Sequence, residues 1–164
     1  MAQNFVDRLR AAQETRDTWL CVGLDPTPSL MPAGVDLLEF GRTIIDATRE
    51  YVCAYKPNLM FYLAYGADGI RALQETIAHV PDDTPVILDA KFGDISYTAE
   101  HYARSAYDVL GADAVTVSPY AGMDAVTPLL SYTTRWPLCW CARRTAAGTI
   151  FSCGRASAHR CIAS

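Results

Sequence analysis

Three ionisable side chains fall within six residues near the middle of the chain, in the order Asp89, Lys91 and Asp94. The apolar run at residues 86–88 follows a turn-forming segment at residues 81–85 and predicts a strand. Because side chains two residues apart on a strand share a face, we expect Asp89 and Lys91 to point the same way. Ionised groups are seldom buried without a partner or a task. The cluster therefore indicates either a salt-bridged strand end or a catalytic site.

Two further charged residues come where other expected strands end. The apolar run at residues 19–24 has strand length and stops at Asp25, and the run at residues 52–55 stops at Lys56. A proline follows each of these charged residues, which ends the strand there. Residues 114–117 form another short apolar run and predict a further strand.

Between these expected strands, apolar residues recur at helical spacing. The helical stretches are residues 5–12, 37–48, 59–80 with Gly66 dividing them into two pieces, 98–110 and 124–130. Four strand–helix units in succession, with continuous apolar strands, predict parallel strands that are buried on both faces. The fold class is therefore α/β, in an open sheet or a (β/α)8 barrel.

The positions of the charged residues favour the barrel. Asp25, Lys56 and Asp89 lie at or next to the carboxyl ends of successive strands, where barrel enzymes place their catalytic groups. An open sheet usually carries a glycine-rich first loop, whereas the first loop here reads D-P-T-P. Because a typical barrel needs about 250 residues, we expect residues 1–134 to form the first half of a (β/α)8 TIM barrel.

Composition excludes several classes of protein. With 164 residues, 51% of them hydrophobic and 20% charged, the chain is long enough for one globular domain with a core. The net charge of −4 argues against a nucleic-acid partner, and no apolar run approaches the roughly 20 residues of a membrane span. The amino terminus does not resemble a secretory signal, so we expect a cytoplasmic protein. Cys21 and Cys53 lie in apolar runs and are expected to be small core residues.

Residues 135–164 have a different character, because the apolar periodicity ends after residues 136–140. When the coding DNA for residues 136–141 is read one base out of frame, the codons for Trp, Pro and Cys become codons for Ala, Leu and Val. These residues would make an apolar fifth strand. We hypothesise that a frameshift near Thr134 replaced the second half of the barrel and left a poorly ordered tail. The alternative is a genuine cysteine-rich tail or zinc element. The spacing of the cysteines in this region fits no known zinc site well; they are Cys139, Cys141, Cys153 and Cys161.

The strand-end residues give the chain a resemblance to the orotidine 5′-phosphate decarboxylases, in particular to the bacterial type 2 subgroup with D-A-K-R-G-D-I in its third strand and loop. The resemblance covers the chain from about residue 19 to residue 132, and it is carried by residues 22–25, 55–57, 88–95 with Thr98, and 111–120. Phe92 stands where the subgroup has Arg, and we expect this difference to alter loop or dimer contacts.

The resemblance implies a lyase that decarboxylates orotidine 5′-phosphate to uridine 5′-phosphate in pyrimidine (UMP) biosynthesis, without a cofactor or a metal. It implies that Lys91 protonates C6 of the pyrimidine ring. Asp89 would lie near the leaving carboxylate, and Lys56 would complete a network of alternating charges that keeps the acids ionised.

The same resemblance implies the roles of the remaining site residues. Asp25 is expected to bind ribose hydroxyls, and Ser118 is expected to contact the substrate. Asp94, Ile95 and Thr98 are implied to reach the active site of a second subunit, so the chain is expected to form a homodimer with shared active sites around its nucleotide substrate.

Two alternative functions stay open, of which the first is closely related and the second belongs to another class. A sister family of sugar-phosphate decarboxylases and aldolases shares D-x-K-x-x-D but uses magnesium, although Lys56 and the G-L-D and K-P-N settings favour the orotidine enzyme. The other alternative is an inactive, truncated barrel fragment. In the decarboxylase family, loops after the later strands, including an arginine, grip the phosphate, and the tail matches none of these motifs.

If the frameshift hypothesis is right, shifting one base near Thr134 in the coding DNA will restore an apolar strand, followed by a phosphate-binding loop that contains an arginine. Sequencing the DNA across this point and reading all frames tests the prediction. A coding sequence without an in-register alternative frame downstream would contradict it.

Overall fold

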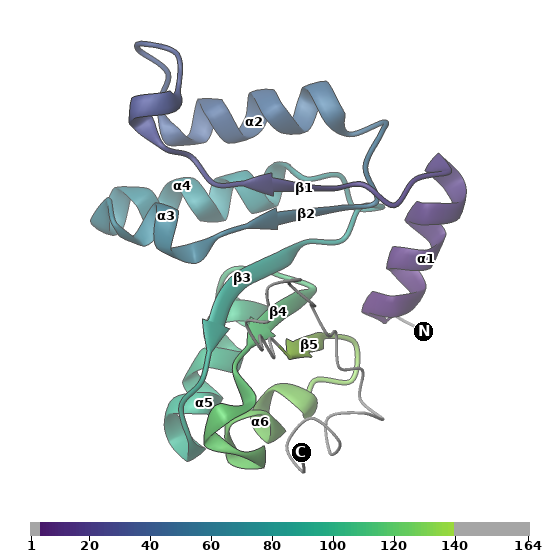
Figure 1. Ribbon diagram of the computed structural model, residues 1–164, viewed down its shortest axis with the longest axis vertical. Coiled ribbons are helices and arrows are strands. Elements are labelled where there is room, and N and C mark those ends of the chain that lie inside the picture. The colour runs from purple at the N-terminus through teal and green to yellow at the C-terminus, as the bar shows by residue number, and fades with distance from the viewer. Residues whose placement is uncertain (1–3, 140–164) are drawn as a thin grey trace, which may run out of the picture.

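The computed structural model describes residues 4–139 (Figure 1). Its helices and strands alternate along the chain as the hydrophobic pattern predicts. In chain order, they are α1 (Phe5–Arg16), β1 (Cys21–Leu24), α2 (Leu37–Thr48), β2 (Ala54–Pro57), α3 (Leu59–Leu63), α4 (Gly66–His79), β3 (Ile87–Phe92), α5 (Ser96–Arg104), β4 (Ala114–Val117), α6 (Thr127–Leu130) and β5 (Trp136–Cys139).

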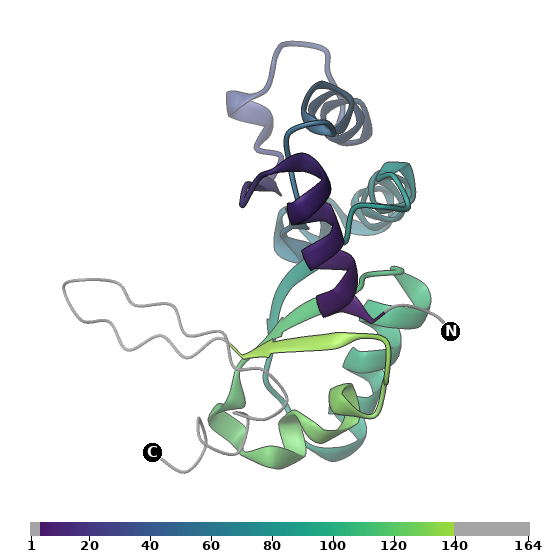
Figure 2. The same ribbon diagram turned by 90° about the vertical axis from the view of Figure 1, so that its right-hand side faces the viewer.

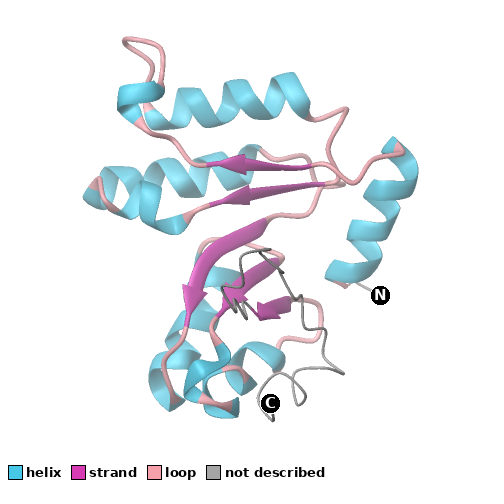
Figure 3. Cartoon of the chain, viewed as in Figure 1, coloured by secondary structure: helices cyan, strands magenta, loops and turns pink. Residues whose placement is uncertain are grey.

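The five strands of this part of the chain are parallel and lie side by side in chain order. β1 pairs with β2, and β3 pairs with β4, which in turn pairs with β5. Parallel bridges from Tyr55 to Val86 and from Asn58 to Asp89 join β2 to β3. Helices lie around the outside of the strands (Figure 3). Because the strand order never reverses, the arrangement is that of a singly wound barrel segment, as predicted, and not of a doubly wound open sheet.

Local signals in the sequence set the helix boundaries. The Asp36 carboxylate accepts a hydrogen bond of 2.8 Å from the Glu39 amide and so caps the amino end of α2. Gly66 adopts a φ of +65°, a conformation that glycine adopts without steric cost, and it separates α3 from α4 as expected. α5 continues into a π-helical turn, Ser105–Val109, and Gly111 at φ +74° follows that turn.

The core lies between the sheet and these helices. It includes side chains that are fully buried, among them Leu24 of β1, Ile45 of α2, Leu73 of α4 and Leu88 of β3. Burying one such side chain stabilises the fold by about 1.5–3 kcal/mol, so packing of each helix on the sheet fixes where the strand ends lie. No helix in the described part of the chain is both long and apolar enough to cross a membrane.

The end of the sheet where the strands begin is held by an ionic cluster around Asp113. The side chain of Asp113 is 8% exposed and forms ion pairs with Arg8 of α1 and with Arg135, the latter at 2.6 Å. Its second oxygen accepts a hydrogen bond of 2.9 Å from the Val86 amide. α1 therefore packs against the amino-terminal end of the sheet, beside the start of β1 and β2 (Figures 1 and 2).

Several predicted boundaries move in the structure. β2 begins two residues later than the apolar run at 52–55, and α5 begins at Ser96 instead of about Thr98. The stretch 124–130 forms a 3₁₀ turn, Met123–Ala125, and the short helix α6 instead of one helix. The prediction that Cys21 is a core residue is wrong, because Cys21 is exposed at the start of β1, whereas Cys53 is buried as expected.

The start of the predicted tail belongs to the sheet. Arg135 bonds to Asp113, and residues 136–139, in the reading frame as printed, form β5 beside β4. The sheet therefore continues beyond the predicted boundary at residue 134. The frameshift and the poor order proposed for the rest of the tail stay predictions, since residues 140–164, with Cys141, Cys153 and Cys161, lie outside the described residues.

Candidate active site

The buried carboxylate of Asp89 joins three neighbouring strands. Its Oδ1 accepts hydrogen bonds from Nζ of Lys91 at 2.6 Å and from Oγ1 of Thr116 at 2.8 Å. Its Oδ2 accepts one from Nζ of Lys56 at 3.2 Å. Asp89 is 7% exposed, whereas the side chains of Lys56 and Lys91 are 35% and 40% exposed. Both ammonium groups are therefore held by a buried anion, while the lysine side chains that carry them are partly exposed.

Two opposed effects set the pKa of Asp89. Burial raises the pKa, because it disfavours the charged form. Hydrogen bonds from Lys91 and Thr116, together with the Lys56 charge, outweigh that effect, so that the net pKa lies below its ordinary value of 3.8. Asp89 is therefore ionised at neutral pH, as the sequence analysis expected of a carboxylate between two lysines.

A bulge in β3 brings Asp89 and Lys91 to the same place. After Leu88, the pairing of β3 with β4 resumes at Phe92, while β4 advances by two residues, so residues 89–91 lie opposite Thr116 alone. Lys91 adopts a φ of +50°, in the left-handed region, which costs a non-glycine residue about 1 kcal/mol or more. The bulge therefore has to be stabilised by its neighbours.

The hydroxyl of Thr116 stabilises the bulge from β4. It accepts hydrogen bonds from the backbone amides of Ala90 and Lys91, each at 3.0 Å, and donates to Asp89. Two accepted bonds and one donated bond use the full capacity of a hydroxyl group. The sequence analysis missed Thr116; the available signal is the single polar residue in the otherwise apolar run at residues 114–117.

Asp25 directly follows β1, at the same carboxyl edge of the sheet. Its Oδ1 is buried and has no hydrogen-bond partner among the described residues. Burial raises the pKa of the nearby Tyr62 hydroxyl to about 12; Thr76 opposes this rise, and the Asp25 charge adds to it. Tyr62 therefore keeps its proton, and Asp25 has an unused acceptor atom, as a ribose-binding carboxylate needs.

Ser118 follows β4 and lies against the end of the bulge. Its amide donates a hydrogen bond of 2.6 Å to the carbonyl of Phe92, and it is half-buried. A Cβ atom added to Gly93 would lie 3.0 Å from the Cβ of Ser118, so Gly93 permits this close approach. The structure therefore brings Ser118 next to the loop that carries the cluster.

Asp94 and Ile95 lie on the exposed turn before α5, and Thr98 lies on the first turn of that helix. The carboxylate of Asp94 accepts a hydrogen bond of 2.8 Å from the amide of Ile95 and therefore caps its own loop. Ile95 is 49% exposed, which is high for an isoleucine. The contact of these three residues with a second subunit stays a prediction.

A cavity of about 670 Å³ lies next to the bulge, between α3, α4 and α5. Lys91 and Asp94 line it together with apolar residues such as Leu59 and Met60. Asp25, Lys56 and Asp89 do not line this cavity, so it lies beside the ionic cluster and not over it.

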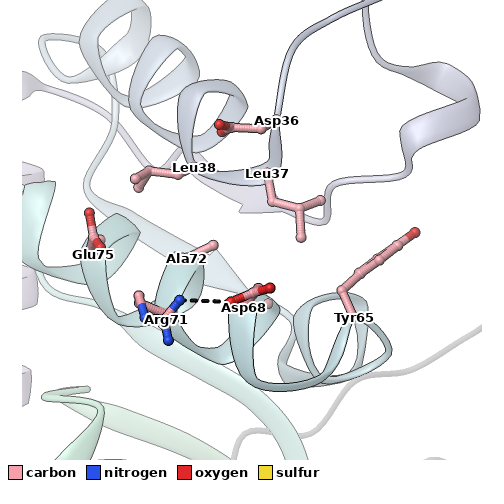
Figure 4. A pocket seen from close by; sticks show the side chains of 9 residues that line it. Asp36, Leu37, Leu38, Tyr65, Asp68, Arg71, Ala72 and Glu75 are labelled. Carbon is pink, nitrogen blue, oxygen red and sulfur yellow. Dashed lines mark hydrogen bonds and ion pairs between the residues drawn. The ribbon is translucent and has the colours of Figure 1, made fainter.

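A smaller cavity of about 290 Å³ lies between α2 and α4 (Figure 4). Asp36 and Leu37 face it from the start of α2, and Tyr65 faces it from just before α4. Asp68 and Arg71 face it from α4, where they form an ion pair of 2.7 Å. None of the predicted site residues lines it. In residues 4–139, no group of three or more His, Cys, Asp or Glu side chains is arranged to hold a metal ion.

Comparison with known proteins gives one family. The family model described as "Orotidine 5'-phosphate decarboxylase / HUMPS family" matches residues 18–146. The chain is 48% identical over 128 residues to the orotidine 5′-phosphate decarboxylase of Dehalococcoides mccartyi, covering 78% of this chain and 47% of that protein. It is 47% identical over 131 residues to the enzyme of the same name from Herpetosiphon aurantiacus, covering 77% and 49%. The chain therefore spans about half the length of the curated relatives it matches.

Solved structures show the same similarity. A crystal structure of a candidate orotidine-monophosphate decarboxylase from Toxoplasma gondii superposes with a TM-score of 0.83 at 40% identity, covering 88% of this chain and 52% of that one. The OMP decarboxylase of Leishmania donovani superposes with a TM-score of 0.79 at 40% identity, covering 87% and 55%. These neighbours confirm the α/β TIM-barrel fold, of which this chain contains the first units.

The substitution Thr116→Val removes the hydroxyl but keeps the shape, and we expect it to raise the pKa of Asp89 and to destabilise the fold. Two backbone amides would lose their acceptor, at a cost of about 1–3 kcal/mol each. Because the pKa of Asp89 is lower in the folded chain, its ionisation stabilises the fold above the unfolded-state pKa, and this contribution is lost as the pH falls through the folded-state pKa.

In Thr116→Val, this pH-dependent contribution should shrink, so that urea unfolding free energies at pH 7 and pH 3 differ by less than in the parent chain. A carbon-13 titration of the Asp89 carboxyl measures the pKa directly. Thr116→Ser keeps the hydroxyl and is the matched control. Equal Asp89 pKa values in the valine and serine variants would refute the assigned role of the hydroxyl.

Proposed function

Since the chain belongs to the orotidine 5′-phosphate decarboxylase / HUMPS family, we propose that it carries the catalytic lysine of a cytoplasmic, cofactor-free lyase that converts orotidine 5′-phosphate to uridine 5′-phosphate in de novo pyrimidine biosynthesis. The observation that carries the proposal is the ladder of charges from Lys56 through Asp89 to Lys91, at 3.2 and 2.6 Å. A half-exposed ammonium group fixed by a buried carboxylate is a preorganised cation, which is what a developing carbanion requires.

In the proposed reaction, the bond between C6 and the carboxylate breaks and its electron pair stays on C6. Carbon dioxide leaves, the Lys91 ammonium group stabilises the negative charge as it develops, and it then gives its proton to C6. Lys91 becomes a neutral amine and regains a proton from solvent. Asp89 lies beside the leaving carboxylate, and Lys56 keeps Asp89 ionised, so that repulsion between the two carboxylates is relieved when carbon dioxide leaves.

The remaining residues of the first half bind the nucleotide in this proposal. Asp25 accepts hydrogen bonds from ribose hydroxyls, which its buried and unpartnered Oδ1 supports. Ser118, next to the bulge, supplies a hydroxyl to the pyrimidine side of the site. Asp94, Ile95 and Thr98 complete the site of a second subunit, which their exposed position on the loop before α5 and on its first turn supports.

Two alternatives remain, each supported by its own observation. The first alternative is an inactive barrel fragment, because the chain covers about half of its relatives. Remote phosphate binding contributes strongly to catalysis, and the resemblance implies that the phosphate loops follow later strands. The family description also includes HUMPS, which supports a related magnesium-dependent sugar-phosphate decarboxylase or aldolase as the second.

The substitution Lys91→Gln tests the proposed proton donor. With orotidine 5′-phosphate labelled at the 6-carboxyl group, we expect release of labelled carbon dioxide by the 164-residue chain to fall at least about 10²-fold in this variant, as expected for the loss of a general acid. Arg71→Gln removes an exposed cation on α4 and is the matched control.

The assay is repeated with a chelator, and turnover that requires added magnesium would favour the sugar-phosphate alternative. Labelled carbon dioxide released equally by Lys91→Gln and the parent chain would refute the role of Lys91. A parent chain that neither releases carbon dioxide nor binds uridine 5′-phosphate would be the inactive fragment.

Exposed apolar side chains support self-association near the same loop. They lie on α3 and at the start of α5, and they comprise Met60, Phe61, Leu63, Ile95 and Tyr97. Because such a group is unusual on a monomer, we expect the chain to sediment as a dimer and Met60→Glu to sediment as a monomer. Leu30→Glu, at an apolar residue that is 84% exposed in another region, should leave the dimer intact. A monomeric parent chain at tens of micromolar would contradict the homodimer.

A further inference from the structure

An aromatic pair holds the catalytic loop from the outer side of the sheet. Phe92 is the last residue of β3, and its ring stacks on Tyr102 of α5, with centroids 4.2 Å apart and ring planes 2° from parallel. We propose that Phe92 and Tyr102 are positioning residues, which fix the β3 bulge and thereby hold the Lys91 ammonium group against Asp89. This inference deepens the proposed function and rests on it, since it concerns the same lysine.

The first step of the argument is the geometry of the strand end. Phe92 directly follows Lys91 on β3, so the position of its ring depends on the backbone conformation of Lys91. Lys91 has a φ of +50°, whereas a residue in a regular strand has a strongly negative φ. Rotation about the Lys91 backbone would carry the Phe92 ring away from Tyr102. The stacked ring therefore opposes relaxation of the lysine backbone.

The second step is that Phe92 is fixed by two groups. Its carbonyl accepts the hydrogen bond of 2.6 Å from the Ser118 amide, and its ring contacts Tyr102. Tyr102 in turn belongs to a helix that is firmly seated on the sheet, because its neighbours Ala99 and Ala103 are 0% and 1% exposed. The stack thus connects the bulge to a rigid helix.

The third step compares the inner and outer supports of the bulge. Thr116 holds the amides of Ala90 and Lys91 from the inner side, and the aromatic stack holds Phe92 from the outer side. The 670 Å³ cavity adjoins both rings. A shorter side chain at position 92 would enlarge this cavity and would not force α5 to repack. Loss of the ring should therefore loosen the bulge while the helices keep their places.

The test uses the 164-residue chain and the carbon-13 titration of the Asp89 carboxyl, assigned with Asp89→Asn. This readout does not need turnover, so it can fail independently of the proposed function. In Phe92→Leu and in Tyr102→Leu, we expect the Asp89 pKa to rise towards its ordinary value, because the hydrogen bond from Lys91 is weakened. Tyr102→Phe keeps the stacked plane and should titrate like the parent chain. Where the chain releases carbon dioxide, the two leucine variants should lower kcat about 10²-fold with little change in KM.

Tyr132→Leu is the matched control for a general loss of aromatic packing. It removes a different ring pair, Tyr107 with Tyr132 at 4.9 Å, away from the bulge, and should leave the Asp89 titration unchanged. Thr116→Val is the positive control, because the expected rise of the Asp89 pKa in this variant shows that the titration detects a lost hydrogen bond. If Phe92→Leu does not fold, the comparison of Tyr102→Leu with Tyr102→Phe tests the proposal instead, because Tyr102→Leu removes the same ring contact from the α5 side. An Asp89 pKa that is unchanged in the leucine variants, or raised equally in Tyr132→Leu, would overturn the proposal.

Discussion

The rest of the candidate site depends on the burial of one carboxylate, that of Asp89. Removing a carboxylate from water is costly, and the cost is offset here because two ammonium groups and one hydroxyl surround it. Lys56, Lys91 and Thr116 come from three neighbouring strands, so these hydrogen bonds also fix how the ends of the strands meet. Deleting one partner of such a buried pair typically costs about 3–5 kcal/mol, which makes the arrangement a single unit and not a set of independent contacts.

A second buried carboxylate, Asp113, has a similar set of partners at the opposite end of the sheet. It pairs with Arg8 and Arg135 and accepts a backbone amide hydrogen bond. The two clusters lie at opposite ends of the strands: Asp113 contacts Arg8 of α1 at the amino-terminal end, and Asp89 contacts two lysines at the carboxyl-terminal end. This division agrees with the general rule for barrels, in which the amino-terminal end of the strands supports stability and the carboxyl-terminal end supports chemistry. A chain of about half the length of its relatives therefore holds Lys91 against Asp89 at the carboxyl-terminal end of the sheet.

Much of this arrangement was predictable, and the failures have physical reasons. The alternation of strands and helices follows from the hydrophobic pattern. Asp89 and Lys91 do meet as expected, but through a bulge that the period of a regular strand does not predict. Thr116 was missed because its role depends on a hydrogen bond across strands, which no local pattern encodes. The strand at residues 136–139 was assigned to the tail because its Trp, Pro and Cys composition is unusual, yet pairing with β4 is decided by backbone groups. Cys21 looked like a core residue because its neighbours are apolar, but β2 is the one strand that pairs with β1 in the described residues, so this end of β1 is exposed.

The sequence by itself determined the fold class, the order of the strands and the set of charged residues at the strand ends, because these depend on periodicity and on residue type. The tertiary structure decided which of those residues meet. It joined Lys56, Asp89 and Lys91 through a bulge with Lys91 in the left-handed region, and it left the residues from Asp94 to Thr98 on an exposed turn. The physical reason is that a bulge is selected by contacts on both faces of the strand, with Thr116 inside and Tyr102 outside, and these residues are brought to β3 by folding alone.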